Sequence, residues 1–228
     1  RSDTHCPLLS VAGLLGVDPA RTPAQVPYLS PPADRAAAWK RRIEAEFPGP
    51  EPRIGVVWAG TPEHTNNRNR SITPETFSPV LAFPGARFIS LQKNGGFPVA
   101  VGPHLVDWSA DLTDFAETAA LISGLDLVIS VDTAVAHLAG SLGKQVWTLL
   151  PKIPDWRWGM QGQTTPWYPT MRLIRQAEAG RWDDVIDRIV TNLYQMKRED
   201  SSPADLLKHA VQSHQQGRID EARRVYLA

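Results

Sequence analysis

The stretch LDLVISVDTAVAHLAGSLG, residues 125–143, decides the fold of this chain. Residues 125–131 form a short, largely apolar run that is rich in β-branched side chains, which predicts a buried strand. Asp132 and Thr133 end the run, and apolar residues then recur at helical spacing until Gly143. A buried strand that passes directly into a helix is typical of a parallel α/β sheet, whose ligands bind at the carboxyl ends of the strands.

The start of this helix predicts an anion-binding site. Its first turn offers backbone N–H groups without intrahelical partners, at the positive end of the helix dipole. Thr133 adds a hydroxyl, and His137 follows one turn later on the same helix face. These groups suit a phosphate or a diphosphate. Asp132 would repel a phosphate, so we interpret it as the N-cap or as the partner of a sugar hydroxyl. His137 has an alternative role as a hydrogen-bonded core histidine.

Strands and helices alternate on both sides of this segment. Strands are expected at residues 53–58, 86–91, 105–106, 145–150 and 171–174, and helices at residues 74–81, 114–123 and 182–193. Thr73 is placed to cap the first of these helices, with Pro74 in its first turn. The alternation predicts an α/β fold with a doubly wound parallel sheet.

Composition divides the chain into three parts. Residues 1–52 are proline-rich and carry one helical pattern, at 33–47, so we interpret them as a lead-in or interdomain linker that packs on the main domain. Residues 53–197 carry the alternating pattern of a Rossmann-like domain. Residues 198–228 begin with a polar hinge and continue as a helical hairpin.

The final segment has the spacing of a partial tetratricopeptide repeat, a helix-turn-helix unit. The matching positions are Leu206, Ala210, Gly217, Ala222 and Tyr226. A single repeat cannot bury its own apolar face, so we expect the chain to be a fragment of a longer protein. A simple amphipathic hairpin is the alternative.

Composition excludes several classes of function. The chain has 228 residues and a net charge of +0, which argues against nucleic acid as a partner. Its one cysteine, Cys6, rules out a disulfide framework and a cysteine-rich zinc site, and suggests a cytoplasmic setting. No apolar run approaches the ~20 residues of an integral membrane segment. Metal-binding HExxH, Walker A and GxGxxG patterns are missing, so a nucleotide would have to be held in another way.

A polar loop at residues 59–72 follows the strand expected at 53–58. Gly60 would let the backbone approach a ligand closely. Arg68 and Arg70 can neutralise a diphosphate through bidentate contacts, and Asn66 can bind a sugar hydroxyl. An ordinary solvated loop is the alternative.

Two further loops follow strand ends. In residues 92–96, Gln92 and Lys93 precede two glycines, and the lysine suits a phosphate, although a surface turn would look the same. Residues 151–169 form a long loop whose Trp156 and Trp158 could stack on a base or a sugar, or could instead pin the loop by burial.

Together these loops resemble the C-terminal half of GT-B glycosyltransferases. The resemblance is strongest to lipopolysaccharide heptosyltransferases and to bacterial tetratricopeptide-repeat glycosyltransferases related to the O-GlcNAc transferases, and it covers roughly residues 53–195. The resemblance rests on the segments RIGVVWAG (53–60), RNRSI (68–72), FISLQK (88–93), DLTDFAETAALISGLDLVISVDTAVAHLAGSLGK (111–144) and PDWRW (154–158). The heptosyltransferases usually have glycine where this chain has Ala134.

The resemblance implies a donor-binding half of a metal-independent, inverting glycosyltransferase. It would use a nucleotide-diphosphate sugar, no cofactor, and a protein or glycan acceptor. By motif match, Thr133 and His137 would hold the diphosphate, while Arg70 and Lys93 would support the leaving group. The other expected substrate-binding residues are Trp58, Gly60, Asn66, Arg68, Gln92, Asp132, Ala134, Asp155, Trp156 and Trp158.

The resemblance also places the catalytic base in an N-terminal half that this chain lacks. We therefore expect nucleotide-sugar binding without turnover. Two alternatives remain open: a non-catalytic interaction module that recruits protein partners through the tetratricopeptide-like helices, and a nucleotide-sugar epimerase.

Overall fold

Six parallel strands form one sheet in the order β3-β2-β1-β4-β5-β6. The computed structural model describes residues 5–18, 25–93, 104–199, 211, 213–215 and 219. The strands are β1 (Arg53–Val57), β2 (Arg87–Ser90), β3 (Leu105–Asp107), β4 (Leu127–Val131), β5 (Gln145–Leu150) and β6 (Met171–Arg175). Every strand lies within two residues of its predicted bounds, and the predicted parallel sheet is confirmed.

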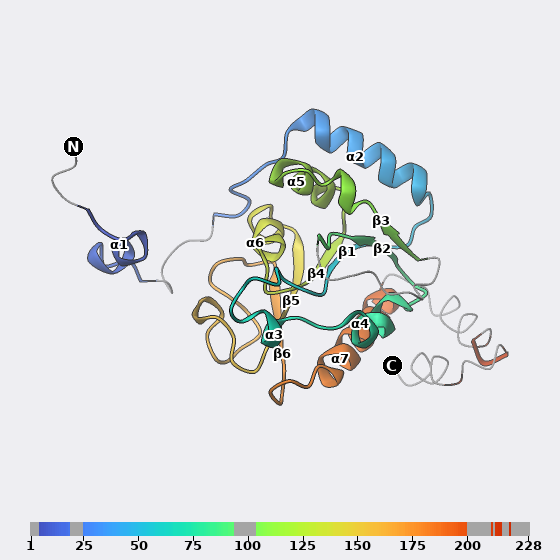
Figure 1. Ribbon diagram of the computed structural model, residues 1–228. Coiled ribbons are helices and arrows are strands. Elements are labelled where there is room, and N and C mark those ends of the chain that lie inside the picture. The colour runs from blue at the N-terminus through green and yellow to red at the C-terminus, as the bar shows by residue number, and fades with distance from the viewer. Residues whose placement is uncertain are drawn as a thin grey trace.

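Helices cover both faces of the sheet, as a doubly wound fold requires. Figure 1 shows α2 (Ala33–Glu46), α5 (Phe115–Ser123) and α6 (Ala134–Ser141) on one side, and α4 (Pro74–Leu81) and α7 (Asp183–Glu199) on the other. Helix α5 contacts both α2 and α6, and α4 packs on α7. The shorter helical elements are α1 (Leu8–Leu14), α3 (Asn67–Arg70) and the 3₁₀ turns η2 (Ser109–Asp111) and η3 (Trp156–Trp158).

Two helix starts show how local sequence sets these bounds. The Thr73 hydroxyl accepts a hydrogen bond from the Thr76 N–H at 3.3 Å, and Pro74 opens α4, as predicted. Asp114 caps α5 in the same way, with its carboxylate 2.7 Å from the Glu117 amide nitrogen. A capped first turn is worth about 1 kcal/mol.

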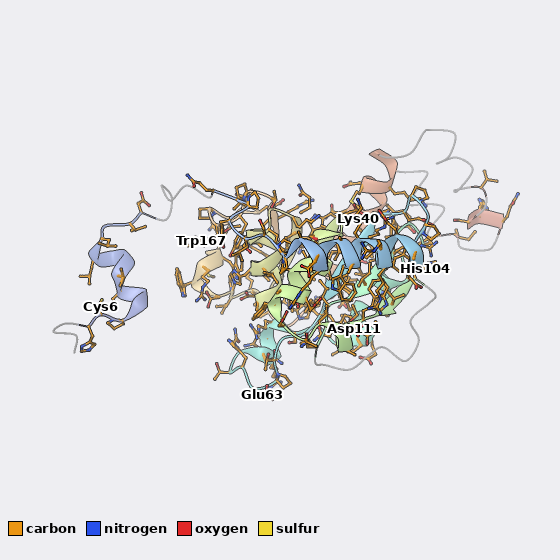
Figure 2. All side chains as sticks on the ribbon, turned by 90° about the horizontal axis from the view of Figure 1, so that it is seen from above. Cys6, Lys40, Glu63, His104, Asp111 and Trp167 are labelled. Carbon is orange, nitrogen blue, oxygen red and sulfur yellow. The ribbon has the colours of Figure 1, made fainter. Side chains whose placement is uncertain are left out.

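Helix α2 belongs to the packed domain although it lies in the proline-rich lead-in. Its Trp39 and Ile43 are buried, and the Trp39 indole N–H donates to a Glu117 carboxylate oxygen at 2.8 Å. Arg42 lies over the Trp39 ring and pairs with Asp111 of η2, which Figure 2 labels beside α2. The expectation that the helical pattern at 33–47 packs on the main domain is confirmed.

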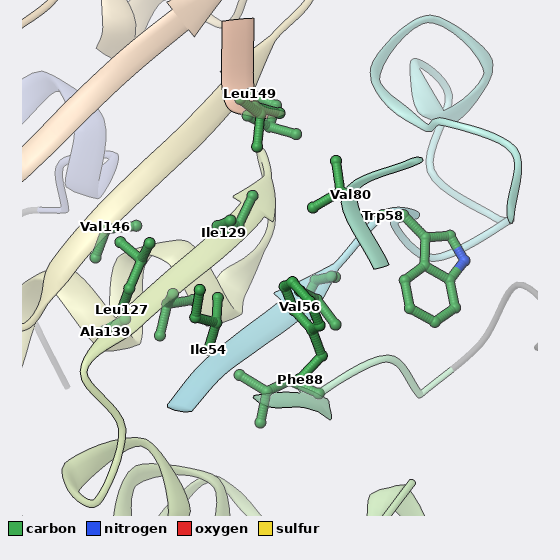
Figure 3. Packing of buried hydrophobic residues seen from close by; sticks show 14 of the residues in the cluster. Ile54, Val56, Trp58, Val80, Phe88, Leu127, Ile129, Ala139, Val146 and Leu149 are labelled. Atoms are coloured by element: carbon green, nitrogen blue, oxygen red, sulfur yellow. The ribbon is translucent and has the colours of Figure 1, made fainter. Parts of the chain in front are cut away.

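The core lies on both faces of the two central strands. Side chains of β1, β2, β4 and β5 pack between the helical layers (Figure 3). Those with essentially no exposed surface include Ile54, Val56, Phe88, Ile129, Val146 and Leu149. Strand β4 is buried at all five positions, as its apolar run predicts for a central parallel strand.

Helices α1 and α7 differ from the sequence expectations, and the expected C-terminal hairpin is untested. Helix α1 was not predicted, because seven residues are too few for a clear periodic pattern. Helix α7 continues to Glu199 rather than ending at 193, since Tyr194 prolongs its buried face against Phe83, with ring centroids 4.8 Å apart. The tetratricopeptide-like hairpin at 198–228 lies almost entirely outside the described residues and stays a prediction.

The described residues contain neither a membrane-spanning helix nor a cluster of metal ligands. No helix there has the length and apolar character that crossing a membrane requires. No group of three or more His, Cys, Asp or Glu side chains there could hold a metal ion.

Replacing Gly140 with alanine is expected to lower the free energy of unfolding by about 1–3 kcal/mol, the usual cost of overpacking a core. An added Cβ would lie 2.6 Å from Cγ of Tyr168, a ring atom that cannot swing aside as a flexible chain end would. Urea unfolding measures the change. Gly13→Ala in α1 is the control, because no described atom outside that helix lies within 4 Å of its new Cβ. Equal stability of the Gly140 variant and the unaltered chain would contradict this packing.

Candidate functional site

A pocket of about 360 Å³ lies at the carboxyl ends of β1, β2 and β4. The strand order runs outward from β1 in one direction through β2 and β3, and in the other through β4, β5 and β6. This reversal leaves a crevice at the ends of β1 and β4, where ligands bind in open α/β sheets. The lining residues are Val57, Ala59, Gly60, Thr61, Arg70, Leu91, Gln92, Lys93, Phe115, Thr133, Ala134 and Val135.

The start of α6 faces this pocket with its first turn uncapped. Thr133 is the N-cap, yet among the described atoms its side chain makes no capping hydrogen bond. Its hydroxyl instead lies 3.0 Å from the Ser130 hydroxyl. The first turn of a helix leaves amide donors without intrahelical partners, and here Ala134 and Val135 line the pocket. These amides are therefore available to a ligand.

The N-cap role predicted for Asp132 is wrong. The helix begins one residue later than that prediction required, so Thr133 occupies the cap position. Asp132 does not line the pocket, and its backbone carbonyl accepts a hydrogen bond from Arg70 Nη1 at 2.8 Å. Its carboxylate oxygen Oδ1 lies 3.9 Å from His137 Nε2.

Arg70 joins the two sides of the crevice. Its guanidinium reaches from the loop after β1 to the end of β4, and it passes directly over Gly60. A Cβ at Gly60 would lie 2.5 Å from Arg70 Nη2, so the glycine is required for this path. Gly60 was predicted to let a ligand approach the backbone closely, but in the structure the group that approaches it is the Arg70 side chain. The arginine still lines the pocket and places a positive charge there.

Gln92 and Lys93 contribute to the pocket in different ways. The buried Gln92 carboxamide accepts from the amides of Trp58 and Ala59 at 3.1 and 2.9 Å, and it donates to the Ala59 carbonyl at 2.9 Å. It thereby fixes the end of β1. Lys93 lines the pocket with an exposed side chain, and no ion pair or hydrogen bond joins it to another described residue. Residues 94–96 of this predicted loop lie outside the described residues.

His137 lies in a second group of side chains, on the other side of the same helix turn. Its ring stacks on Trp158, with centroids 4.9 Å apart, and its Nδ1 lies 3.0 Å from the Tyr168 hydroxyl oxygen. His137 does not line the pocket. The predicted convergence of Thr133 and His137 on one point is thus only partial.

The environment of His137 keeps its imidazole neutral at pH 7. Burial lowers the pKa of His137, against the opposing attraction of Asp132. Burial and a hydrogen bond with Tyr28 raise the pKa of Tyr168, so that hydroxyl keeps its proton. The direction of its hydrogen bond with His137 Nδ1 depends on the imidazole tautomer, and Nε2 of the ring lies 3.9 Å from Asp132 Oδ1.

The predicted aromatic contacts divide by burial. Trp58 has no exposed surface and packs on Phe77, with ring centroids 5.9 Å apart, and Trp158 is 3% exposed. The prediction that Trp158 stacks on a ligand is therefore wrong, and the alternative of a loop pinned by burial is confirmed. The buried ring of Trp58 is likewise out of reach of a substrate. Trp156 is 64% exposed, but Arg157 lies over its ring at 5.0 Å.

Three other predicted residues lie away from the pocket lining. Asn66 accepts a hydrogen bond from Asn69 at 2.7 Å, and Arg68 is exposed on α3. Asp155 caps η3 and pairs with Arg157 at 2.8 Å. Their roles toward a substrate stay predictions.

Phe115 is a pocket residue that sequence reasoning missed. Its spacing with Ala119 and Ile122 predicts the buried face of α5, yet Phe115 is 64% exposed and lines the pocket. Residue spacing shows which side chains share a helix face, but it does not show where the layer that covers this face ends.

Fold and pocket together define a parallel α/β domain with a pocket, lined by Arg70 and Lys93, at the switch point of its sheet. Residues 110–182 of this domain match the family model of Glycosyltransferase family 9 (heptosyltransferase). The matched region contains α6, Thr133, His137 and η3. This match supports the predicted resemblance to heptosyltransferases over these residues.

Two longer proteins are similar to the chain. It is 30% identical over 184 residues to Protein FlbA of Caulobacter vibrioides, an alignment that covers 75% of this chain and 29% of that protein. The crystal structure of a family 9 glycosyl transferase from Veillonella parvula DSM 2008 is similar with a TM-score of 0.48 and 11% identity, and the match covers 74% of this chain and 47% of that one. The chain therefore spans less than half the length of either.

The imidazole of His137 is expected to titrate with a pKa below 6.5, because burial disfavours its charged form. A group whose pKa is lowered by folding stabilises the protein fully above its unfolded pKa. This stability is then lost as the pH falls toward the folded value. An NMR titration of the ring protons, assigned by comparison with His137→Gln, measures the midpoint. A midpoint at or above 6.5 would contradict the burial of this ring.

Proposed function

We propose that this domain binds the diphosphate of a nucleotide-sugar donor in the pocket between β1 and β4. The uncapped first turn of α6 is the observation that carries the proposal. Its amides at Ala134 and Val135, and the Thr133 hydroxyl, face a pocket that also holds positive charge. A helix N-terminus with open amides is a general site for phosphate groups.

The side chains around this turn would supply the charge that a departing diphosphate needs. Arg70 and Lys93 line the same pocket, and the α6 dipole adds positive potential at its first turn. Fixed donors of this kind stabilise negative charge as it develops in a transition state. This supports the proposal that transfer is metal-independent and uses no cofactor.

His137 would act as a neutral hydrogen-bonding group beside the donor. Its Nε2 lies 3.9 Å from Asp132 Oδ1, a separation that leaves room for a sugar hydroxyl to approach both groups. Its stacking on Trp158 and its bond to Tyr168 fix the ring in place. We propose that Asp132 and His137 together hold the sugar side of the donor.

The larger enzyme follows from the family 9 match and forms part of the same proposal. Residues 53–197 would be the donor-binding half of an inverting, GT-B type glycosyltransferase in the cytoplasm, with 1–52 as its linker. The catalytic base and the protein or glycan acceptor would meet this half from elsewhere in a longer protein. Residues 198–228 would recruit protein partners through a tetratricopeptide-like hairpin.

Calorimetric titration with UDP, ADP and GDP tests the pocket. Lys93→Ala is expected to weaken binding about 5- to 10-fold, and Thr133→Val by a similar factor, because each removes one charged or hydroxyl contact to the diphosphate. Affinity should fall with added salt, and it should be unchanged by a chelator.

The matched control is Lys40→Ala, which removes one positive charge from an exposed side chain of α2 (Figure 2). This control should bind like the unaltered chain. If Lys93→Ala and Lys40→Ala weaken binding equally, only net charge matters and the assigned pocket is wrong. If none of the three nucleotides binds the unaltered chain, the proposed function itself fails.

A further inference from the structure

Phe115 is an exposed aromatic ring at the edge of the pocket. It is the first residue of α5 and is 64% exposed, whereas the residues below it on the same helix face, Thr118, Ala119 and Ile122, are buried. The apolar face of α5 therefore continues past the covered part of the helix and emerges at the pocket. An exposed aromatic ring gains favourable free energy when a ligand removes it from water.

The ring is carried by a fixed helix start. Asp114 caps α5 through the Glu117 amide and also pairs with Arg35 of α2 at 3.1 Å. The helix is thus held at the residue next to Phe115, on a regular element that positions a side chain better than a loop does.

The pocket lining contains two chemically different groups of residues. Arg70, Lys93 and Thr133 supply charge and a hydroxyl, while Leu91, Val135 and Phe115 supply apolar surface. A ligand that carries both an anion and an apolar ring would use both groups. A free phosphate would use only the first group.

We propose that Phe115 stacks on the base of the nucleoside diphosphate whose diphosphate lies at the start of α6. The assignment rests on the proposed function and extends it to the part of the donor that the charged groups do not reach. Trp156 is equally exposed, but it does not line the pocket and its ring is already covered by Arg157. Of the exposed aromatic rings in the described residues, Phe115 is the one that the pocket presents to a ligand.

Binding of four probes to the chain separates the ring contact from the anion contact. The probes are ADP, UDP, inorganic pyrophosphate and glucose 1-phosphate. Phe115→Ala is expected to weaken ADP and UDP about 5- to 100-fold, the range that loss of one base–aromatic stack covers, and to leave pyrophosphate and glucose 1-phosphate unchanged. Phe115→Trp should retain nucleotide binding, and Phe115→Leu should fall between the two. Circular dichroism should show unaltered folding, since the side chain is exposed.

The other outcomes overturn the assignment in distinguishable ways. An equal loss of pyrophosphate affinity would mean that Phe115 shapes the anion site. A comparable loss for glucose 1-phosphate would move the ring contact to the sugar. Unchanged nucleotide affinity in Phe115→Ala would exclude stacking and leave the diphosphate site standing. If no probe binds the unaltered chain, the proposed function and this inference fail together.

Discussion

The parallel pairing of β1 with β4 is the constraint on which the rest of the site depends. Ile54 through Val57 lie beside Leu127 through Ser130, so both strands end at the same level and deliver their loops to one crevice. Parallel strands require long crossovers, and here these run in opposite directions from β1. The crevice is therefore a product of topology. Arg70 and Gln92 then fix its walls, one by holding the Asp132 carbonyl and the other by holding the backbone at Trp58 and Ala59.

Charge is separated across the first turn of α6. Arg70 and Lys93 lie on the pocket side, while the neutral His137 and its partners Trp158 and Tyr168 lie on the other. The Asp132 carboxylate lies 3.9 Å from the histidine, and Asp132 is not among the residues that line the pocket. An anion that enters the pocket would therefore meet cations, and the acidic group that would repel it is not part of the lining.

Sequence alone predicts the framework of this molecule well and its side-chain directions poorly. A central strand such as β4 is predictable because it is buried at every position and its sequence is therefore largely apolar. Thr73 and Pro74 predict a helix start because one caps the helix and the other fits its first turn. The N-cap at α6 was placed one residue early, since Asp132 and Thr133 are both good caps and only the backbone decides between them. The resemblance predicts substrate contacts for Trp58 and Trp158, yet both side chains are buried in the structure. Phe115 shows the reverse error, since helical spacing reports a shared face but not where the neighbouring layer stops.

The attachment of α2 has a mechanical consequence. Arg42 lies over both Trp39 and Trp108, and Arg35 and Trp39 bind acidic residues at the start of α5. These charged, aromatic and hydrogen-bonded contacts attach α2 to the packed domain. A pivot between this domain and a preceding one would then lie before Ala33, and an excised domain that begins at Arg53 would leave the α2-facing surface of α5 open to solvent. The smallest self-contained unit consequently starts with α2, twenty residues before the first strand.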